Sequence, residues 1–239
     1  LGIVIPDRPG LVERMRRKPM VPLVIGVVLL VVATVVLKLW RERRQNLPQV
    51  AEVNQREGME ALERGDYSLA KDRLRKAANA LTELRDDEAG KVRQAAGEAA
   101  IFADQVGEKL EDLIDTAAYK SEEWPDLFDR KYRGRSVLLE GTLKERRDHE
   151  PGFELDYRIV GDGKAPKTGW VDLTDLAIFE GGAAKAGQKV TFGARLASIT
   201  LDDRGEFRMR FEPESGVFMT NVKALKALPD WDEGAEDLP

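Results

Sequence analysis

The residues that could do chemistry in this chain are few, and their types exclude several common reactions. The chain of 239 residues has no cysteine and one histidine, His149, in the polar stretch RRDHEPG. Thiolate catalysis, disulfide bonds and the common zinc sites need more of these residue types. No serine lies in a nucleophile setting such as G-x-S-x-G. We therefore interpret His149 as a solvated loop residue and expect no enzyme activity.

Two short segments bear a partial likeness to ligand-binding loops. Gly161-Asp162-Gly163-Lys164 lacks the glycine frame and the Ser/Thr of a phosphate loop, so we interpret it as a turn. Asp202-Asp203 lacks the ligand spacing of a calcium loop. We therefore predict no catalytic residue, no metal and no cofactor.

Charge is divided unevenly along the chain. Residues 1–46 carry nine Lys or Arg and three Asp or Glu, a net charge of +6; the whole chain carries −5, so residues 47–239 carry −11. A basic segment suits anionic lipid head groups. A large acidic region is a poor match for a nucleic-acid binder, which needs a basic footprint. We therefore do not expect nucleic acid among the partners.

The first structural element that the sequence predicts is an apolar run near the start of the chain. Residues 20–37 read MVPLVIGVVLLVVATVVL, without a charge, between RMRRKP and KLWRERR. About 20 apolar residues cross a bilayer as a helix. The alternative is a cleaved signal peptide, whose apolar region has about 7–15 residues. We predict a transmembrane helix at 20–40. Its predicted anchor residues are Met20, Val24, Val28, Val32, Val36 and Trp40.

Basic residues flank this run on both sides. Those predicted to contact lipid head groups are Arg14, Arg16, Arg17, Lys18, Arg41, Arg43 and Arg44. The positive-inside rule compares five basic residues before the run with four or five after it, which is nearly balanced. A short basic tail before a span and a long polar domain usually inserts with the tail inside. We therefore predict a single-pass protein of the inner (cytoplasmic) membrane. Residues 1–19 would be a cytoplasmic tail, and the large C-terminal region would be periplasmic, that is, extracytoplasmic.

Residues 49–118 have a helical composition, rich in Ala, Leu, Glu, Lys and Arg. Gly65 and Asp66 suit the end of one helix and the N-cap of the next. A second helix-rich stretch follows from about Asp87 to Lys120. We predict a helical repeat-like domain of three helices over 41–120.

The hairpin resembles a tetratricopeptide repeat over about 54–87. The residues at the spacing of that motif are Gly58, Gly65, Tyr67, Ala70, Leu74 and Ala77. The chain departs from the motif at Asn54, where the repeat has Trp, and at Thr82, where it has Pro. The resemblance implies a surface for docking a peptide or protein, and a helical spacer is the alternative. Tyr67, Leu74 and Trp231 are the predicted docking residues.

After residue 120, apolar residues recur at every second position. Val137, Leu139, Gly141 and Leu143 alternate with polar or outward positions, which is typical of a strand. Further predicted strands are 153–160, 168–174, 188–201 and 206–212, and 175–186 is a short helix or a loop. We place this strand-rich domain at 121–228 and expect Trp124, Leu127 and Phe128 to pack together at its start.

The strand-rich segment resembles bacterial OB-fold domains related to the anticodon-binding type, over about 132–222. The resemblance rests on Gly134, Val137, Gly141 and Leu143, echoed by Gly187, Val190, Ala194 and Leu196. It implies a five-stranded barrel with a helix or loop after the third strand, and a sandwich is the alternative. The predicted fold class is thus α+β: a single transmembrane helix, a short α-helical repeat-like segment and a small five-stranded OB-like β-barrel.

Two further patterns concern the surface. Arg208 and Arg210 alternate with Phe207, Met209 and Phe211, which predicts a basic outer face over an apolar inner face. The tail at 229–239, PDWDEGAEDLP, has five acids around Trp231, a composition that does not pack a core. We interpret the tail as a disordered end or as a docking segment for a basic partner.

These patterns together favour a non-catalytic, membrane-anchored scaffold or accessory subunit of a larger membrane protein complex. Its expected partners are membrane lipid and other subunits of that complex. The alternative is a membrane-tethered module that binds a ligand or an oligosaccharide on the OB-like barrel.

Overall fold

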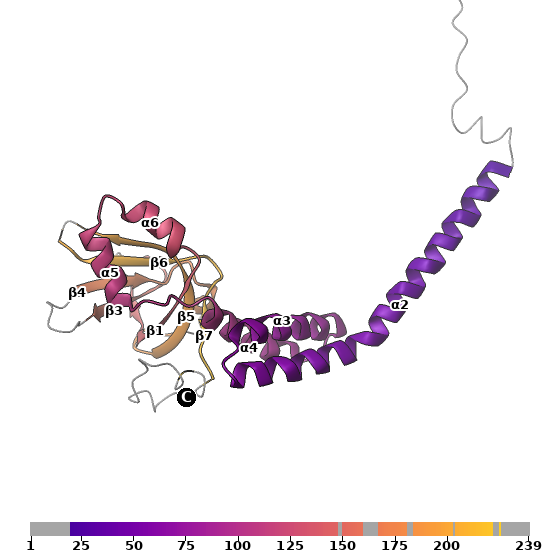
Figure 1. The fold of residues 1–239 in the computed structure, drawn as a ribbon, viewed down its shortest axis with the longest axis horizontal. Coiled ribbons are helices and arrows are strands. Elements are labelled where there is room, and N and C mark those ends of the chain that lie inside the picture. Colours follow the sequence, from indigo (N-terminus) through magenta and orange to yellow (C-terminus); the bar gives the residue numbers. More distant parts are fainter. Residues whose placement is uncertain are drawn as a thin grey trace, which may run out of the picture. The chain divides into compact units, whose positions relative to one another are not determined.

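The structure of this chain, a computed structural model, describes residues 20–147, 150–159, 167–180, 184–202, 204–221 and 225. Within these residues, helices come first and strands follow (Figure 1). The chain divides into two compact units, Leu1–Gln49 and Val50–Pro239, which we describe separately. The content is α+β, with helices and a curled sheet.

The first unit contains the start of helix α2 (Met20–Glu63), which continues into the second unit. The large apolar side chains described between Val24 and Leu39 are exposed, with exposed fractions of 51–69%. A membrane-spanning helix needs about 20 apolar residues in succession. In the part of the chain that the structure describes, no helix contains a stretch both long and apolar enough to cross a membrane.

This finding contradicts the predicted transmembrane helix at residues 20–40. The single-pass topology, the inner-membrane location and the periplasmic placement of the C-terminal region depended on that helix, and they are corrected with it. The prediction treated the valine-rich run between basic residues as an element of its own. In the structure these residues are instead the first part of a 44-residue helix whose second part is polar.

The second unit opens with the helical hairpin expected at Gly65-Asp66. Helix α2 ends at Glu63, and Gly65 has φ +77°, a left-handed conformation that favours glycine. The Asp66 carboxylate accepts a hydrogen bond from the backbone N–H of Leu69 at 3.2 Å, so it caps helix α3 (Tyr67–Leu84). The predicted break between the two helices is confirmed.

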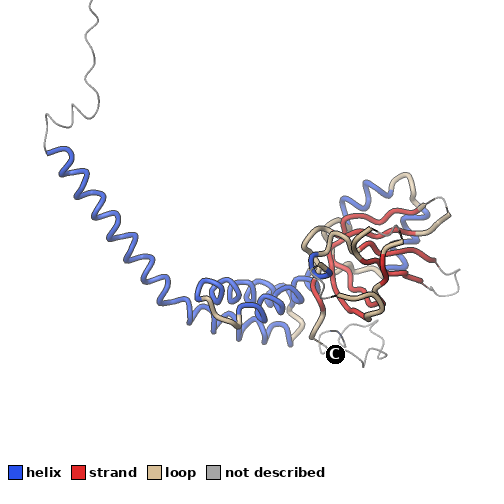
Figure 2. The backbone as a smooth tube through the Cα atoms, turned by 180° about the vertical axis from the view of Figure 1, so that it is seen from behind, coloured by secondary structure: helices blue, strands red, loops and turns tan. Residues whose placement is uncertain are grey.

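Helix α3 packs against α4 (Ala89–Ala103), and Figure 2 shows the two helices side by side. Helix α3 also contacts the last part of α2, where Arg73 of α3 pairs with Glu57 at 3.2 Å. The buried face of α3 is made of Ala70, Leu74, Ala77, Ala78, Ala80 and Leu81. A Cβ on Gly58 of α2 would lie 2.7 Å from Cγ of Leu74, so this contact brings the two helices close. Small residues at helix crossings allow such an approach.

Two shorter helices follow, α5 (Leu110–Tyr119) and α6 (Trp124–Lys131). The rings of Trp124 and Phe128 lie 5.6 Å apart, and Leu127 packs against the same core, as the sequence predicted. The Trp124 Nε1–H donates to the carbonyl oxygen of Ile199 at 2.7 Å, which ties α6 to the sheet. A buried indole N–H usually finds such a partner.

The sheet contains seven strands in the described residues, in the order β1-β5-β6-β4-β3-β2, with β7 paired to β5. Their bounds are β1 Ser136–Thr142, β2 Lys144–Glu145, β3 Phe153–Ile159, β4 Lys167–Asp172, β5 Lys189–Leu201, β6 Phe207–Phe211 and β7 Val217–Phe218. The 3-10 helix η1 (Ala177–Phe179) lies between β4 and β5. Strands β4 and β6 are parallel, and the other pairs are antiparallel. The five strand segments predicted from alternation are therefore present, with ends shifted by one or two residues.

The sheet curls because β1 and β2 are two parts of one chain segment, separated by Leu143 alone. Strand β1 pairs with β5, whereas β2 pairs with β3 at the other end of the strand order. Since β2 contributes only two residues, this second contact is short. The sheet is therefore a curled half-barrel of mixed strands.

The core lies on the concave side of the sheet. Its largest fully buried members include Phe192, Phe207 and Phe211, which are 0–1% exposed. Gly193 of β5 has no room for a side chain, because a Cβ there would lie 2.3 Å from Cγ2 of Ile101 on α4. This close approach is where the helical layer meets the sheet.

Candidate functional site: the charged outer face of the sheet

The outer face of β3, β4 and β6 carries a connected group of charged side chains. In β6, Phe207, Met209 and Phe211 are buried while Arg208 and Arg210 lie on the other side, so the predicted alternation is confirmed. We call the group Arg146, Arg147, Arg158, Arg208 and Arg210 the guanidinium face.

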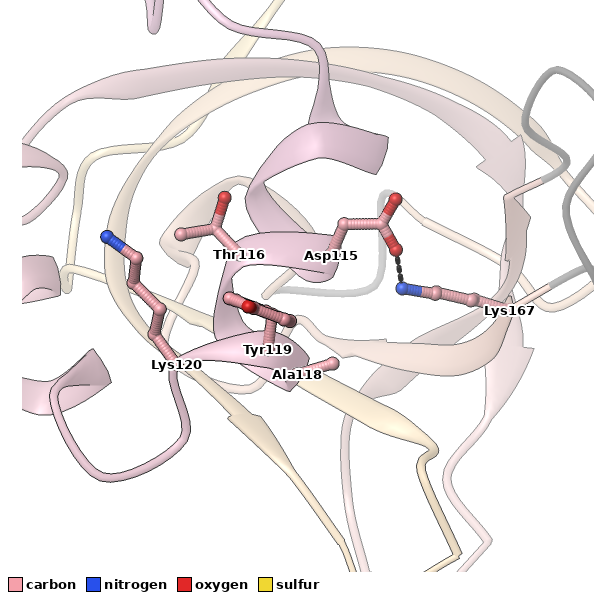
Figure 3. A pocket seen from close by; sticks show the side chains of 6 residues that line it. All are labelled: Asp115, Thr116, Ala118, Tyr119, Lys120 and Lys167. Carbon is pink, nitrogen blue, oxygen red and sulfur yellow. Dashed lines mark ion pairs between the residues drawn. The ribbon is translucent and has the colours of Figure 1, made fainter.

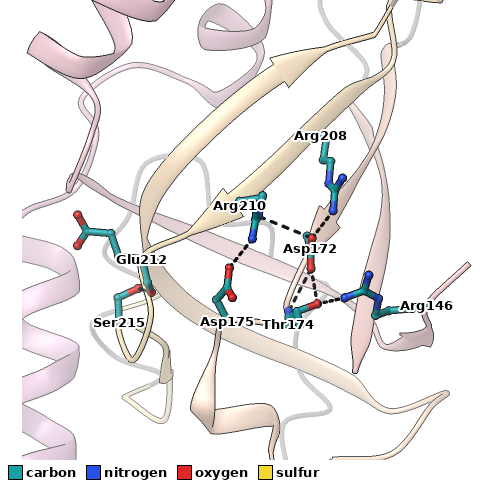
Figure 4. Close-up of polar contacts among 8 residues, drawn as sticks. All are labelled: Arg146, Asp172, Thr174, Asp175, Arg208, Arg210, Glu212 and Ser215. Carbon is teal, nitrogen blue, oxygen red and sulfur yellow. Dashed lines mark hydrogen bonds and ion pairs between the residues drawn. The ribbon is translucent and has the colours of Figure 1, made fainter. Parts of the chain in front are cut away.

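Asp172, the last residue of β4, is the centre of this network (Figure 4). Arg208 Nη2 donates to Asp172 Oδ2 at 2.6 Å, and Arg210 Nε lies 3.9 Å from the same oxygen. The backbone N–H and the hydroxyl of Thr174 donate to Asp172 Oδ1 at 3.1 and 2.6 Å. Arg146 in turn donates to the Thr174 hydroxyl. One carboxylate thus holds three guanidinium groups in place, directly or through Thr174.

Burial and hydrogen bonding act in opposite directions on Asp172, whose side chain is 7% exposed. Burial raises the pKa of the carboxyl, but the hydrogen bonds from Thr174 and Arg208, with the charge of Arg208, outweigh it and hold the pKa below its ordinary value. Asp172 is therefore ionised at neutral pH. Nearby, Arg210 Nη2 donates to Asp175 Oδ2 at 2.9 Å, which extends the network toward the loop after β4.

A second group lies beside the first. The guanidinium of Arg147 stacks 5.0 Å from the ring centre of Trp170 and donates from Nε to Glu154 Oε1 at 2.8 Å. Both Arg147 and Lys144 pair with Asp156. The hydrogen bond from Lys144 lowers the pKa of Asp156, burial opposes this, and the hydrogen bond from Arg147 adds to it. The pKa of Asp156 therefore lies below its ordinary value.

These groups border a small depression of about 290 Å³. It is lined by Arg147, Asp156, Tyr157, Arg158, Thr168, Gly169 and Glu206. Gly169 is required here, because a Cβ would lie 2.2 Å from the carbonyl oxygen of Phe207 on the neighbouring parallel strand. Such a lining can recognise carboxylate or phosphate groups through guanidinium N–H donors. It offers no nucleophile paired with a base.

A larger hollow of about 570 Å³ lies at the end of α5 (Figure 3). Asp115 and Lys167 form an ion pair on one side of it, and Lys120 lies on the other. The ring of Tyr119 is 90% exposed. Asp115 and Lys167 pair with each other, so the role that remains for this hollow is surface contact with another molecule.

Glu98 of α4 is a polar residue that sequence analysis missed. Only 2% of it is exposed, and it accepts hydrogen bonds from the backbone N–H of Thr220 at 3.1 Å, the Thr220 hydroxyl at 2.5 Å and the N–H of Asn221 at 3.0 Å. Gln94 Nε2 donates to it at 3.1 Å. The carboxylate fastens the segment after β7 to the helical layer. The sequence signal for Glu98 is its position four residues before Phe102, which places both residues on the buried face of α4.

The predicted anchor residues Val24, Val28, Val32, Val36 and Trp40 are all exposed in the first unit, with Arg44 stacked 5.2 Å from the Trp40 ring. Met20 lies in the same helix. Among the predicted lipid-contact residues, Arg41 and Arg44 are exposed and Arg43 lies in α2. Arg14, Arg16, Arg17 and Lys18 lie outside the described residues. The part that any of these basic residues plays in partner contact stays a prediction.

The structure describes two of the three predicted docking residues, Tyr67 and Leu74. Leu74 is fully buried between α2 and α3. Tyr67 is half-buried and stacks on Phe102 with ring centres 4.8 Å apart. Trp231 lies outside the described residues, as do His149 and the turn at 161–163. Among the described residues, no group of three or more His, Asp or Glu is placed to hold a metal ion.

Comparison of this chain with models of protein families, with curated proteins and with solved structures finds no match. The comparisons therefore give no support to the resemblances to tetratricopeptide repeats and OB-fold domains.

Proposed function

We propose that this chain is a non-catalytic accessory or scaffold subunit of a larger protein complex. The observation that carries the proposal is the exposed apolar stretch of α2 between Val24 and Leu39, where valine and leucine side chains are 51–69% exposed. Contiguous exposed apolar surface of this kind marks an interaction site. A helix that is apolar on all sides is normally buried among other elements. The partner we propose is an apolar surface of another subunit.

The second unit suits the role of a folded platform. Its charged side chains pair with one another, as in the Asp172 network and in the contacts of Arg147 with Glu154 and Asp156. Such groups are already neutralised and oriented by the fold. They stabilise and shape a surface without needing a substrate to complete them.

Site-specific photo-crosslinking in the full chain tests the proposal. A p-benzoylphenylalanine in place of Val32 (53% exposed) is expected to give one discrete crosslinked product with a partner subunit in cells. The matched control replaces Met59, which is 41% exposed on the same helix but belongs to the second unit. Equal products from the two positions, or a chain that stays uncrosslinked and migrates alone at every concentration, would refute the proposal.

A second candidate function is the binding of a small ligand on the outer face of the sheet. The depression beside Trp170, with Arg147 and Arg158 in its lining, favours it. A thermal-shift screen of the full chain with oligosaccharides and small anions checks this, because a ligand at 100 times its Kd adds about 2.7 kcal/mol to stability. A melting temperature unchanged by every compound would remove this candidate.

A further inference from the structure

The depression beside Trp170 has a lining that is balanced in charge. Its four charged residues are two cations and two anions, Arg147, Arg158, Asp156 and Glu206. Arg147 and Asp156 pair with each other. Within the described residues, the side chains of Arg158 and Glu206 have no ion-pair or hydrogen-bond partner. One cation and one anion of the lining are therefore available to a ligand.

The pairing of the strands places these two side chains on opposite sides of one small residue. Arg158 of β3 pairs with Thr168 of β4. The parallel pairing of β4 with β6 begins at Gly169 and Phe207, so Thr168 and Glu206, one residue earlier in each segment, are neighbours. Neighbouring strands lie about 4.8 Å apart, so the backbones at Arg158 and Glu206 are separated by about 10 Å. A guanidinium and a carboxylate thus lie on either side of a threonine in one depression.

A ligand with a single type of charge fits this lining poorly. A simple anion would approach Asp156 and Glu206 as well as the guanidinium groups, and a simple cation would approach Arg147 and Arg158. A ligand with one carboxylate and one ammonium group matches both unpaired side chains. A guanidinium holds a carboxylate with two parallel N–H donors, and a carboxylate accepts from the three donors of an ammonium group. The lining therefore favours a zwitterion.

We propose that this depression binds the zwitterion of an amino acid or a dipeptide, with its carboxylate on Arg158 and its ammonium group on Glu206. The inference rests on the second candidate function, the binding of a small ligand on this face. The volume of about 290 Å³ suits a ligand of this size. The exposed hydroxyl of Thr168 lies between the two charged side chains and can donate or accept a further hydrogen bond. Arg147, stacked on the Trp170 ring, borders the same depression and gives it a fixed wall.

Binding of glycylglycine to the full chain, measured by saturation-transfer difference NMR, tests the proposal. N-acetylglycylglycine lacks the ammonium group, and glycylglycinamide lacks the carboxylate. We expect saturable binding of glycylglycine and a Kd at least about tenfold higher for either derivative, because each has lost hydrogen bonds between charged groups. Equal Kd values for the three peptides, or no saturable binding of glycylglycine, would overturn the proposal.

Two variants assign the two ends of the ligand. Arg158→Gln should bind glycylglycine and glycylglycinamide with Kd values within about twofold of each other, because the carboxylate has lost its partner. Glu206→Gln should in the same way lose the preference for glycylglycine over N-acetylglycylglycine. The matched control is Arg195→Gln, since the Arg195 side chain is 46% exposed and ion-paired with Glu212 at 3.2 Å. It should leave all three Kd values within about twofold.

A charge swap separates loss of binding from loss of structure. The double variant Arg158→Glu and Glu206→Arg keeps one cation and one anion beside Thr168, so it should recover binding of glycylglycine that each single charge reversal abolishes. Single variants that keep the wild-type preference for both ends, or a swap that stays inactive with an unchanged melting temperature, would refute the assignment.

The two ligand experiments fail in different ways. A melting temperature raised by an oligosaccharide or a small anion, without binding of glycylglycine, would keep the second candidate function and overturn the zwitterion. Crosslinking at Val32 concerns the first unit and is independent of both results.

Discussion

Replacement of Glu98 by alanine tests how the helical layer is fastened to the end of the sheet. The substitution removes the acceptor of hydrogen bonds from the backbone N–H groups of Thr220 and Asn221 and from the Thr220 hydroxyl. A hydrogen bond to a charged group contributes about 1.5–3 kcal/mol, and a buried donor left without a partner costs about 1–3 kcal/mol. Because Thr220 is exposed, water can replace part of what it loses. We expect a loss of about 3 kcal/mol in the free energy of unfolding.

The free energy of unfolding is measured by urea denaturation of the full chain, with circular dichroism as the signal. For a unit of this size, about 3 kcal/mol corresponds to a fall in Tm of about 6–12 °C. The matched control is Glu88→Ala, just before the start of the same helix, where the carboxylate pairs with Lys91 and both side chains are more than half exposed. That change should cost no more than about 0.5 kcal/mol. A double-mutant cycle with Thr220→Val should show coupling of about 1 kcal/mol. The reasoning fails if Glu98→Ala costs no more than Glu88→Ala.

Three further predictions concern packing, titration and capping. Gly193→Val should destabilise the chain by about 1–3 kcal/mol, because a Cβ meets Ile101 at 2.3 Å; unfolding in urea measures it, and an unchanged midpoint would contradict the packing. Asp172 has its folded pKa below the unfolded value, so its contribution to stability is present above the unfolded pKa and is lost as the pH falls through the folded one. The difference in Tm between wild type and Asp172→Asn should accordingly shrink as the pH is lowered from 7 to 3, and a constant difference would show that the charge does not matter. Asp66→Ala should cost about 1 kcal/mol through the lost N-cap, whereas Asp66→Asn, which keeps an accepting oxygen, should cost much less.

Local patterns were predictable because the residues that make them are close in sequence. The turn at Gly65-Asp66 depends on one left-handed glycine and one carboxylate that accepts from a backbone N–H three residues away. The alternation of Phe207 and Arg208 in β6 has the period of a strand, and burial follows that period. Each of these features can be recognised without knowing what packs against it.

The apolar run at 20–37 shows where local reasoning failed. Its hydropathy predicts a separate span, but the helix that contains it continues to Glu63. The described residues contain no helix that could cross a membrane. The length of a helix that contains an apolar segment depends on the residues that follow the segment and on their packing. A hydropathy pattern includes neither.

The sequence by itself determined that helices precede strands, the hairpin break at Gly65-Asp66 and the sidedness of β6, because these depend on residue spacing and backbone preference. Only the tertiary structure decided which charges meet. Glu98 binds Thr220 and Asn221, 122 and 123 residues further along the chain, and Asp172 binds Arg208, 36 residues away. Many acids and bases of this chain have the right chemistry for such contacts. Folding selects among them, because a carboxylate and its donor must come within about 3 Å, and the packing of α4 and the curl of the sheet set that distance.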